Sequence, residues 1–227
     1  MAKKEENKNV LENQEALQEK VVGFEHWIES NSKVVFGLVG VAVLAVAGYF
    51  GFSYYKDNQN DIAQKEMFQA IRYFEADSLS LALNGDGNNL GFVAIIDDYS
   101  MTDAANLANY YAGVCYLKQG EFETAILYLK DFSSNDLLVQ PRAYSLLGDA
   151  HMELDRFEEA ASYYSKASNY MPNKYFTPAY LMKEALAYEK LNQNEKAIAA
   201  YDRIITEFFD SPEFTNAKKY KARLQKN

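Results

Sequence analysis

The sequence predicts an all-α protein, with a single N-terminal transmembrane helix followed by an α-solenoid. Residues 34–55 form 22 consecutive positions without a charged side chain, in a chain that is 24% charged. After residue 100 the sequence repeats with a period of about 35 residues, the length of a two-helix unit. We expect an acidic amphipathic tail over 1–33, the membrane helix over 34–55, a leading helical pair over 56–100, three repeats over 101–210 and a capping helix over 211–227.

Residues 34–55 are long enough to cross a bilayer. A helix of this length reaches about 33 Å, and the hydrocarbon core is about 30 Å thick. A cleavable signal peptide is the alternative, since Ala45-Val46-Ala47 has the form of a cleavage site. However, the preceding 33 residues hold seven acidic residues and five lysines, whereas a signal peptide has a short basic leader. We therefore expect a retained anchor in contact with membrane lipid.

The predicted span has small residues along one helical face. That face consists of Gly37, Gly40, Leu44, Gly48 and Gly51, at spacings of 3, 4, 4 and 3. Small residues let helix backbones approach closely in lipid, which predicts a lateral partner in the membrane. The alternative is composition alone, because glycine is common in membrane helices.

The tail before the span has the periodicity of an amphipathic helix. Leu17, Val21, Phe24 and Ile28 form its apolar stripe. Its polar face consists of Glu15, Gln18, Glu19, Lys20 and Glu25. Two interpretations stay open: the helix lies on lipid headgroups, or it docks a partner. Asn31 or Ser32 is expected to cap the start of the membrane helix.

The clearest repeat begins at Pro141 and covers 34 residues. Its pattern residues are Tyr144, Leu147, Gly148, His151, Phe157, Ala160, Tyr164, Ala167 and Pro172. This spacing is the tetratricopeptide pattern, with His151 where an aromatic residue is usual. Gly148 and Ala160 must be small, because the two helices of a repeat touch backbone to backbone there.

Two further copies share this register. The first holds Ala112, Gly113, Tyr116, Gly120, Phe122, Ala125, Leu129 and Phe132. The third opens at Pro178 and holds Ala185, Tyr188, Ala197, Tyr201 and Ile204. This third copy matches the repeat pattern less closely, since Glu184 stands at position 7, where an apolar residue is usual.

Helices are also expected at both ends of the repeats. Residues 62–83 should continue from the membrane helix and pack with residues 90–99 as a degenerate leading repeat. Ser211-Pro212 has the form of a helix start and predicts a last, capping helix. Between the leading helices, Asn84–Asn89 resembles a calcium loop, but Asn89 and Ile95 stand where that loop needs glycine and glutamate. We interpret it as a turn.

The composition argues against several functions. Residues after Lys56 carry −8 of the formal net charge of −9, which argues against nucleic acid as a partner. We find no catalytic motif, cofactor motif or metal-binding pattern, so we expect no enzyme. Cys115 lies at helical spacing beside Tyr111 and Val114 and is expected to be a packed thiol.

Repeat domains bind through the concave surface that is lined by the first helix of each unit. We call its predicted residues the groove set. They are Leu107, Tyr110, Val114, Leu117, Arg142, Ser145, Asp149, Met152, Met182 and Leu186. They are largely apolar, with methionines that can repack around varied ligands. The alternative is that the leading helices cover this face.

The layout of the chain resembles the YfgM-type membrane-anchored tetratricopeptide family. The specific part of this resemblance is the segment Phe24–Lys33, the glycine-containing span and Tyr54-Tyr55. The resemblance implies an accessory subunit of the Sec translocon in the bacterial inner membrane, working with a PpiD-like folding factor and with emerging secretory chains. It also implies a cytoplasmic N-terminus and periplasmic repeats.

Two other functions remain open. One is a scaffold for another cell-envelope complex, and the other is a regulator whose repeats face the cytoplasm. Charge does not decide orientation, because Lys20 and Lys33 flank one end of the span while Lys56, Lys65 and Arg72 flank the other.

Overall fold

The computed structural model describes Gln18 and residues 21–226, which fall into two compact units that divide between Tyr55 and Lys56. Within the described residues every regular element is helical, so the predicted all-α class is confirmed. Of the predicted tail, Leu17 and the polar residues Glu15, Glu19 and Lys20 lie outside the described residues.

The described part of the tail is helical over residues 21–30 and carries exposed aromatic rings. Phe24 and Trp27 stack with ring centroids 6.2 Å apart. Asn31 was expected to cap the next helix, but its side-chain amide donates to the carbonyl of Trp27 at 2.9 Å. The side chain of Asn31 therefore ends the tail helix, and its backbone carbonyl accepts the first bonds of the next one.

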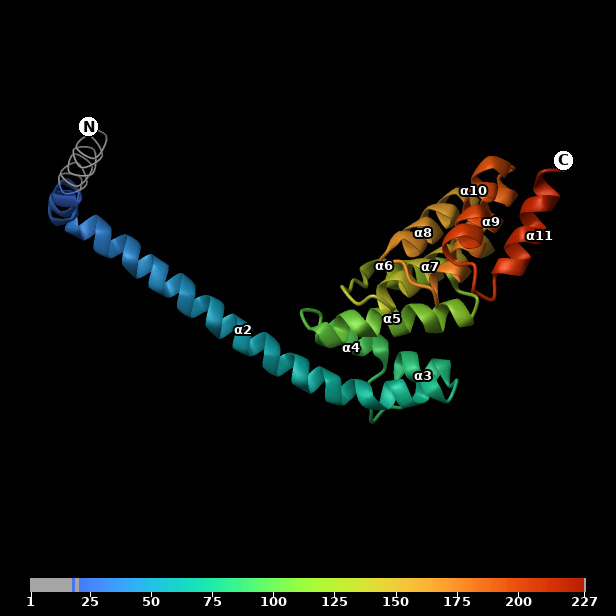
Figure 1. Ribbon diagram of the computed structural model, residues 1–227. Coiled ribbons are helices and arrows are strands. Elements are labelled where there is room, and N and C mark those ends of the chain that lie inside the picture. The colour runs from blue at the N-terminus through green and yellow to red at the C-terminus, as the bar shows by residue number, and fades with distance from the viewer. Residues whose placement is uncertain (1–17, 19–20, 227) are drawn as a thin grey trace, which may run out of the picture. The chain divides into compact units, whose positions relative to one another are not determined.

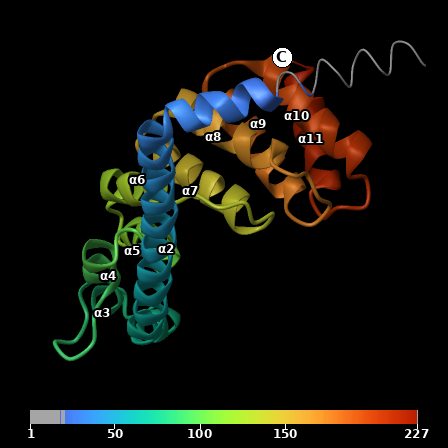
Figure 2. The same cartoon turned by 90° about the vertical axis from the view of Figure 1, so that its left-hand side faces the viewer.

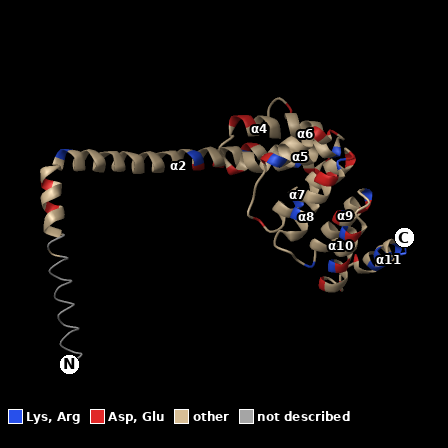
Figure 3. Ribbon diagram, turned by 90° about the horizontal axis from the view of Figure 1, so that it is seen from above, with Lys and Arg blue, Asp and Glu red and all other residues tan. Residues whose placement is uncertain are grey.

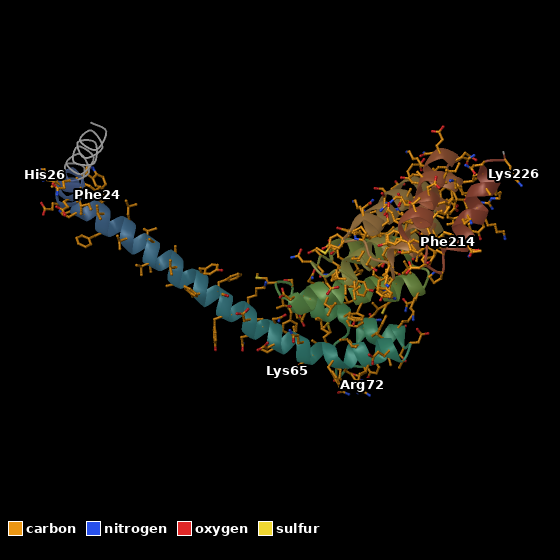
Figure 4. The ribbon with its side chains drawn as sticks, in the orientation of Figure 1. Phe24, His26, Lys65, Arg72, Phe214 and Lys226 are labelled. Atoms are coloured by element: carbon orange, nitrogen blue, oxygen red, sulfur yellow. The ribbon has the colours of Figure 1, made fainter. Side chains whose placement is uncertain are left out.

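Helix α2 runs from Ser32 to Glu75 without interruption, although it contains four glycines. It is the one helix among the described residues that is long and apolar enough to cross a membrane. Its most apolar stretch has a mean hydropathy of 2.3, and none of that stretch is buried within the protein. Figure 3 shows the long uncharged part of α2 between its first and second basic positions. Its side chains project outward along the helix (Figure 4).

Residues 56–100, which were expected to form a pair of helices, consist of the end of α2 and two short helices, α3 and α4. The expected helix over 62–83 breaks after Glu75, and α3 follows from Leu79 to Asn84 and α4 from Phe92 to Asp98. At the break, Asp77 adopts a φ of +56°, and the N–H of Ser78 bonds back to Tyr73. This left-handed turn lets the short α3 fold back instead of continuing the rod.

The solenoid consists of antiparallel helix pairs that follow one another in chain order (Figure 1, Figure 2). Their bounds are α5 Asp103–Lys118, α6 Phe122–Asp131, α7 Val139–Glu153, α8 Phe157–Asn169, α9 Thr177–Lys190, α10 Asn194–Glu207 and α11 Phe214–Leu224. Each helix packs mainly on the helices before and after it, as expected for a repeat array.

Two helix starts differ from those expected. Pro141 is the third residue of α7, because the carboxylate of Asp136 accepts the N–H groups of Leu138 and Val139 and starts the helix earlier. Ser211 and Pro212 form a turn, and α11 begins at Phe214, whose N–H bonds to the carbonyl of Ser211.

The small residues lie where paired helices approach most closely. A Cβ atom added to Gly148 would lie 2.5 Å from the ring of Tyr164, and one added to Gly113 would lie 2.5 Å from Leu129. Ala160 is completely buried. Packing at this distance explains why these positions cannot carry larger side chains.

Candidate protein-binding surface

The groove set comes from the first helix of each repeat, namely α5, α7 and α9. Its members differ widely in exposure. Arg142 and Leu186 are exposed, Ser145 is buried, and the other members are half-buried. The structure groups several of them at two places, one in the middle of the solenoid and one near its C-terminal end.

At the N-terminal end, the leading helices occupy part of the predicted surface. Leu107 packs into the core that α5 shares with α2 and α4. Beside it, the ring of Tyr111 stacks on Phe92 at 5.2 Å. Leu107 is therefore a core residue here, as the alternative interpretation expected.

Tyr110 and Leu117 pack on the cluster between the first and second repeats, against Ile126 and Leu147. Met152 packs on the next cluster along the chain, near Tyr164. These three members of the groove set are therefore structural residues as well as candidate surface residues. Val114 is half-buried on the same helix as Tyr110.

Arg142 is the central cation of the surface. Burial raises the pKa values of Tyr110 and Tyr180, and Arg142 lies close enough to both hydroxyls to oppose that shift. Asp149 acts on Tyr180 in the opposite direction. The tertiary structure thus brings the Arg142 guanidinium near two phenols from the neighbouring repeats.

A second polar cluster joins the second and third repeats. Lys183 donates to Asp149 at 2.7 Å and to Ser145 at 3.2 Å, and the hydroxyl of Tyr164 donates to Asp149 at 2.7 Å. Burial and the neighbouring carboxylate raise the pKa of Tyr164. Lys183 adds a charged group that the groove set did not include, and its ammonium compensates the charge of Asp149. The middle of this surface is therefore more polar than the sequence predicted.

Tyr180 and Lys183 were missed by the sequence interpretation. They stand at positions 3 and 6 of the third repeat, outside the positions from which the groove set was chosen. The sequence signal for the Asp149–Lys183 pair is an acidic residue at position 9 of one repeat and a lysine at position 6 of the next, 34 residues apart.

Near the C-terminal end, Met182 and Leu186 line a pocket of about 360 Å³ with Tyr201 and Tyr220. Leu186 is 47% exposed, which is high for a leucine beside a pocket. At the rim, Glu189 accepts a hydrogen bond from the hydroxyl of Tyr201 and pairs with Arg223. The lining of this pocket therefore combines apolar and aromatic side chains with the charged groups of Lys183, Glu189 and Arg223.

No described residue packs against the glycines of the predicted membrane-packing face. A Cβ atom added at Gly37, Gly40, Gly48 or Gly51 would meet no atom within 4 Å, and Leu44 is 73% exposed. The glycines therefore serve no packing purpose among the described residues.

The described residues hold no group of three or more histidine, cysteine or acidic side chains placed to bind a metal ion. Cys115 is fully buried, and burial raises the pKa of its thiol to about 12. A thiol with so high a pKa is a poor nucleophile at neutral pH, so Cys115 is a packing residue.

Comparison with known families supports the repeat assignment. A family model described as tetratricopeptide repeat matches residues 116–174, and a second with the same description matches residues 179–211. No curated protein matches the chain. The matched residues cover α6 to α10, the paired helices described above. The chain therefore carries tetratricopeptide repeats over residues 116–174 and 179–211, and an apolar N-terminal helix long enough to span a membrane precedes them.

Proposed function

We propose that this protein is a membrane-anchored accessory subunit of the Sec translocon that binds polypeptide on the concave surface of its repeats. Residues 34–55 would hold it in the bacterial inner membrane, with the N-terminus in the cytoplasm and the repeats in the periplasm. A PpiD-like folding factor would be its partner. Tetratricopeptide repeats act as scaffolds for protein–protein interaction, which supports the general part of this proposal.

The observation that carries the proposal is the exposed, mixed surface of α7 and α9. Arg142 offers an exposed cation near Tyr110 and Tyr180, and Leu186 and Met182 offer apolar area that lines a pocket. Aromatic, arginine and methionine side chains are enriched where proteins bind partners. Apolar burial contributes about 25 cal/mol per Å², from which the ordering of an unfolded segment must be subtracted. We therefore expect brief, modest binding to chains in transit.

Site-specific photocrosslinking in intact cells tests the binding surface. We expect a photoreactive residue at Leu186 or Arg142 to trap protein, because both side chains are exposed on the first helices of their repeats, which the proposal assigns to the concave surface. Glu158 on α8 is the matched control, since it is exposed on a second helix of a repeat. Products at Glu158 with none at Leu186 and Arg142 would move binding to another surface.

The identity of the trapped proteins separates the proposed function from a scaffold. A translocon accessory should yield newly secreted chains together with translocon subunits, and pulse labelling identifies the former by their short lifetime on the protein. A scaffold of another envelope complex should yield the same few stable proteins whether or not secretion is active.

A further inference from the structure

The two edges of the solenoid differ in chemistry. The loops between repeats, which precede α5, α7 and α9, carry large apolar side chains that are 43–75% exposed. These are Met101, Leu137, Leu138, Met171, Tyr175 and Phe176. We call this row the apolar edge. Exposed apolar residues that gather in one region, rather than lying scattered, mark sites of interaction with protein or membrane.

The loops within repeats are polar by contrast. They join α5 to α6, α7 to α8 and α9 to α10, and their exposed residues include Gln119, Glu121, Asp155 and Asn192. They lie at the other ends of the same helices. For α5, with 16 residues, that separation is about 24 Å. One edge is therefore suited to water and the other to an apolar environment.

Hydrogen bonds join the loops of the apolar edge to one another. Asn106, in the first turn of α5, exchanges two hydrogen bonds with the backbone of Ser133, at 2.8 and 3.0 Å. The hydroxyl of Tyr170 then donates to the carbonyl of Ser134 at 3.2 Å. In Figure 1 the loops before α5 and α7 lie at the same end of their helices. The apolar side chains thus belong to one continuous edge.

This edge begins beside the first residue after the apolar span. Lys56 directly follows residues 34–55, and its ammonium lies 3.5 Å from the carboxylate of Asp103, at the start of α5. One turn later, the side chain of Asn60 accepts the N–H of Ala104 at 2.9 Å. If residues 34–55 cross a membrane, the loop that carries Met101 starts within a side-chain length of the headgroups.

We propose that the apolar edge inserts into the surface of the same membrane that anchors the chain, so that the repeats rest on the lipid by their inter-repeat loops. This inference rests on the membrane anchor of the proposed function. Tyrosine and phenylalanine suit the boundary between headgroups and acyl chains. These loops hold one acidic residue, Asp136, against one basic residue, Lys174, and so offer no basic cluster for anionic lipid; the contact is apolar insertion.

Depth-dependent fluorescence quenching tests this inference on the full chain in nanodiscs of phosphatidylcholine. An environment-sensitive NBD label is placed at Leu138→Cys, at Tyr175→Cys, at the polar-edge control Asn192→Cys, or at Val43→Cys within the span. The unsubstituted protein, whose Cys115 is buried, gives the background. We expect lipid carrying a nitroxide quencher to lower emission about twofold or more at the two apolar-edge sites and at Val43, but not at Asn192.

The outcomes are distinct. Quenching at Val43 with none at Leu138 and Tyr175 overturns the inference and leaves the anchor intact. If Val43 is not quenched, residues 34–55 do not lie in the lipid, which contradicts the anchor of the proposed function and therefore this inference as well. A blue shift at the edge without quenching shows that protein covers these residues, which also overturns the inference. As a further check, Leu137→Ser together with Leu138→Ser should reduce the quenching at Tyr175→Cys.

Discussion

Two buried polar residues stand where the repeat pattern favours apolar or aromatic ones. His151 is 5% exposed and stacks on Tyr163 with ring centroids 5.3 Å apart, and both of its ring nitrogens are buried without a hydrogen-bond partner among the described residues. Glu184 is also buried and accepts a hydrogen bond from Ser168 at 2.8 Å. Both residues make stability depend on pH.

His151 should lower stability in acid. Burial depresses its pKa below the ordinary 6.5, although Glu159 opposes this while Lys130 and Arg156 favour it. As the pH falls through 6.5, the unfolded chain takes up a proton that the folded protein refuses, so the free energy of unfolding decreases. His151→Phe keeps the stacking and removes two unpaired nitrogens. We expect it to gain about 1–3 kcal/mol at pH 7 and more at pH 5.5, by denaturant unfolding in detergent. A gain that does not grow in acid would contradict this account.

Glu184 should lower stability at neutral pH. Burial raises its pKa, while Ser168, Ser165 and Arg203 partly oppose that shift. The folded state therefore holds the proton to higher pH than the unfolded state, and stability decreases as the pH rises above the ordinary pKa. Glu184→Gln should raise the free energy of unfolding by about 1 kcal/mol at pH 7, with the gain shrinking toward pH 4. Glu195→Gln, at an exposed position of α10, is the control and should change little.

At the scale of the helices, the repeats depend on close approach within each pair, and α2 offers a glycine face that none of the described residues covers. The first feature concerns the core and the second concerns contacts outside the chain. Each leads to a prediction with a different measurement.

The interface between α7 and α8 leaves no room at Ala160. Ala160→Phe should cost about 1–3 kcal/mol by overpacking, because the site is completely buried and the approach at Gly148 is already tight. Glu159→Ala, at the exposed neighbouring position, should cost little. Equal losses in thermal or denaturant unfolding would show that the assigned repeat register is wrong.

The glycine face of α2 should bind a lateral partner in the membrane. Gly40→Leu with Gly48→Leu should weaken co-purification of that partner from membranes, because bulky side chains keep the helix backbones apart. Val39→Leu with Val46→Leu is a matched control on exposed positions of the same helix. If both double variants retain the partner equally, the glycines reflect composition alone.

For the whole molecule, orientation separates the proposed function from a cytoplasmic regulator. Alkaline phosphatase joined after Asn227 should be active, because the enzyme folds only outside the cytoplasm and the proposal places the repeats there. A fluorescent cytoplasmic reporter at the same position is the complementary measurement. An inactive phosphatase with a fluorescent reporter would place the repeats in the cytoplasm.

The sequence alone determined the apolar helix, the repeat period and the small residues at the helix contacts. These features depend on local periodicity and on the size of single side chains, both of which can be read along the chain. It also predicted that Cys115 is packed, because the cysteine lies at helical spacing among apolar residues.

Only the tertiary structure decided where the leading helix breaks, which groove residues are core, and which polar partners meet. The break after Glu75 depends on a single left-handed turn at Asp77, which periodicity does not reveal. Leu107 became a core residue because the leading helices fold back onto α5. Lys183 meets Asp149 because stacking places the first helices of neighbouring repeats side by side, and such pairing is a property of the packed array rather than of any local segment.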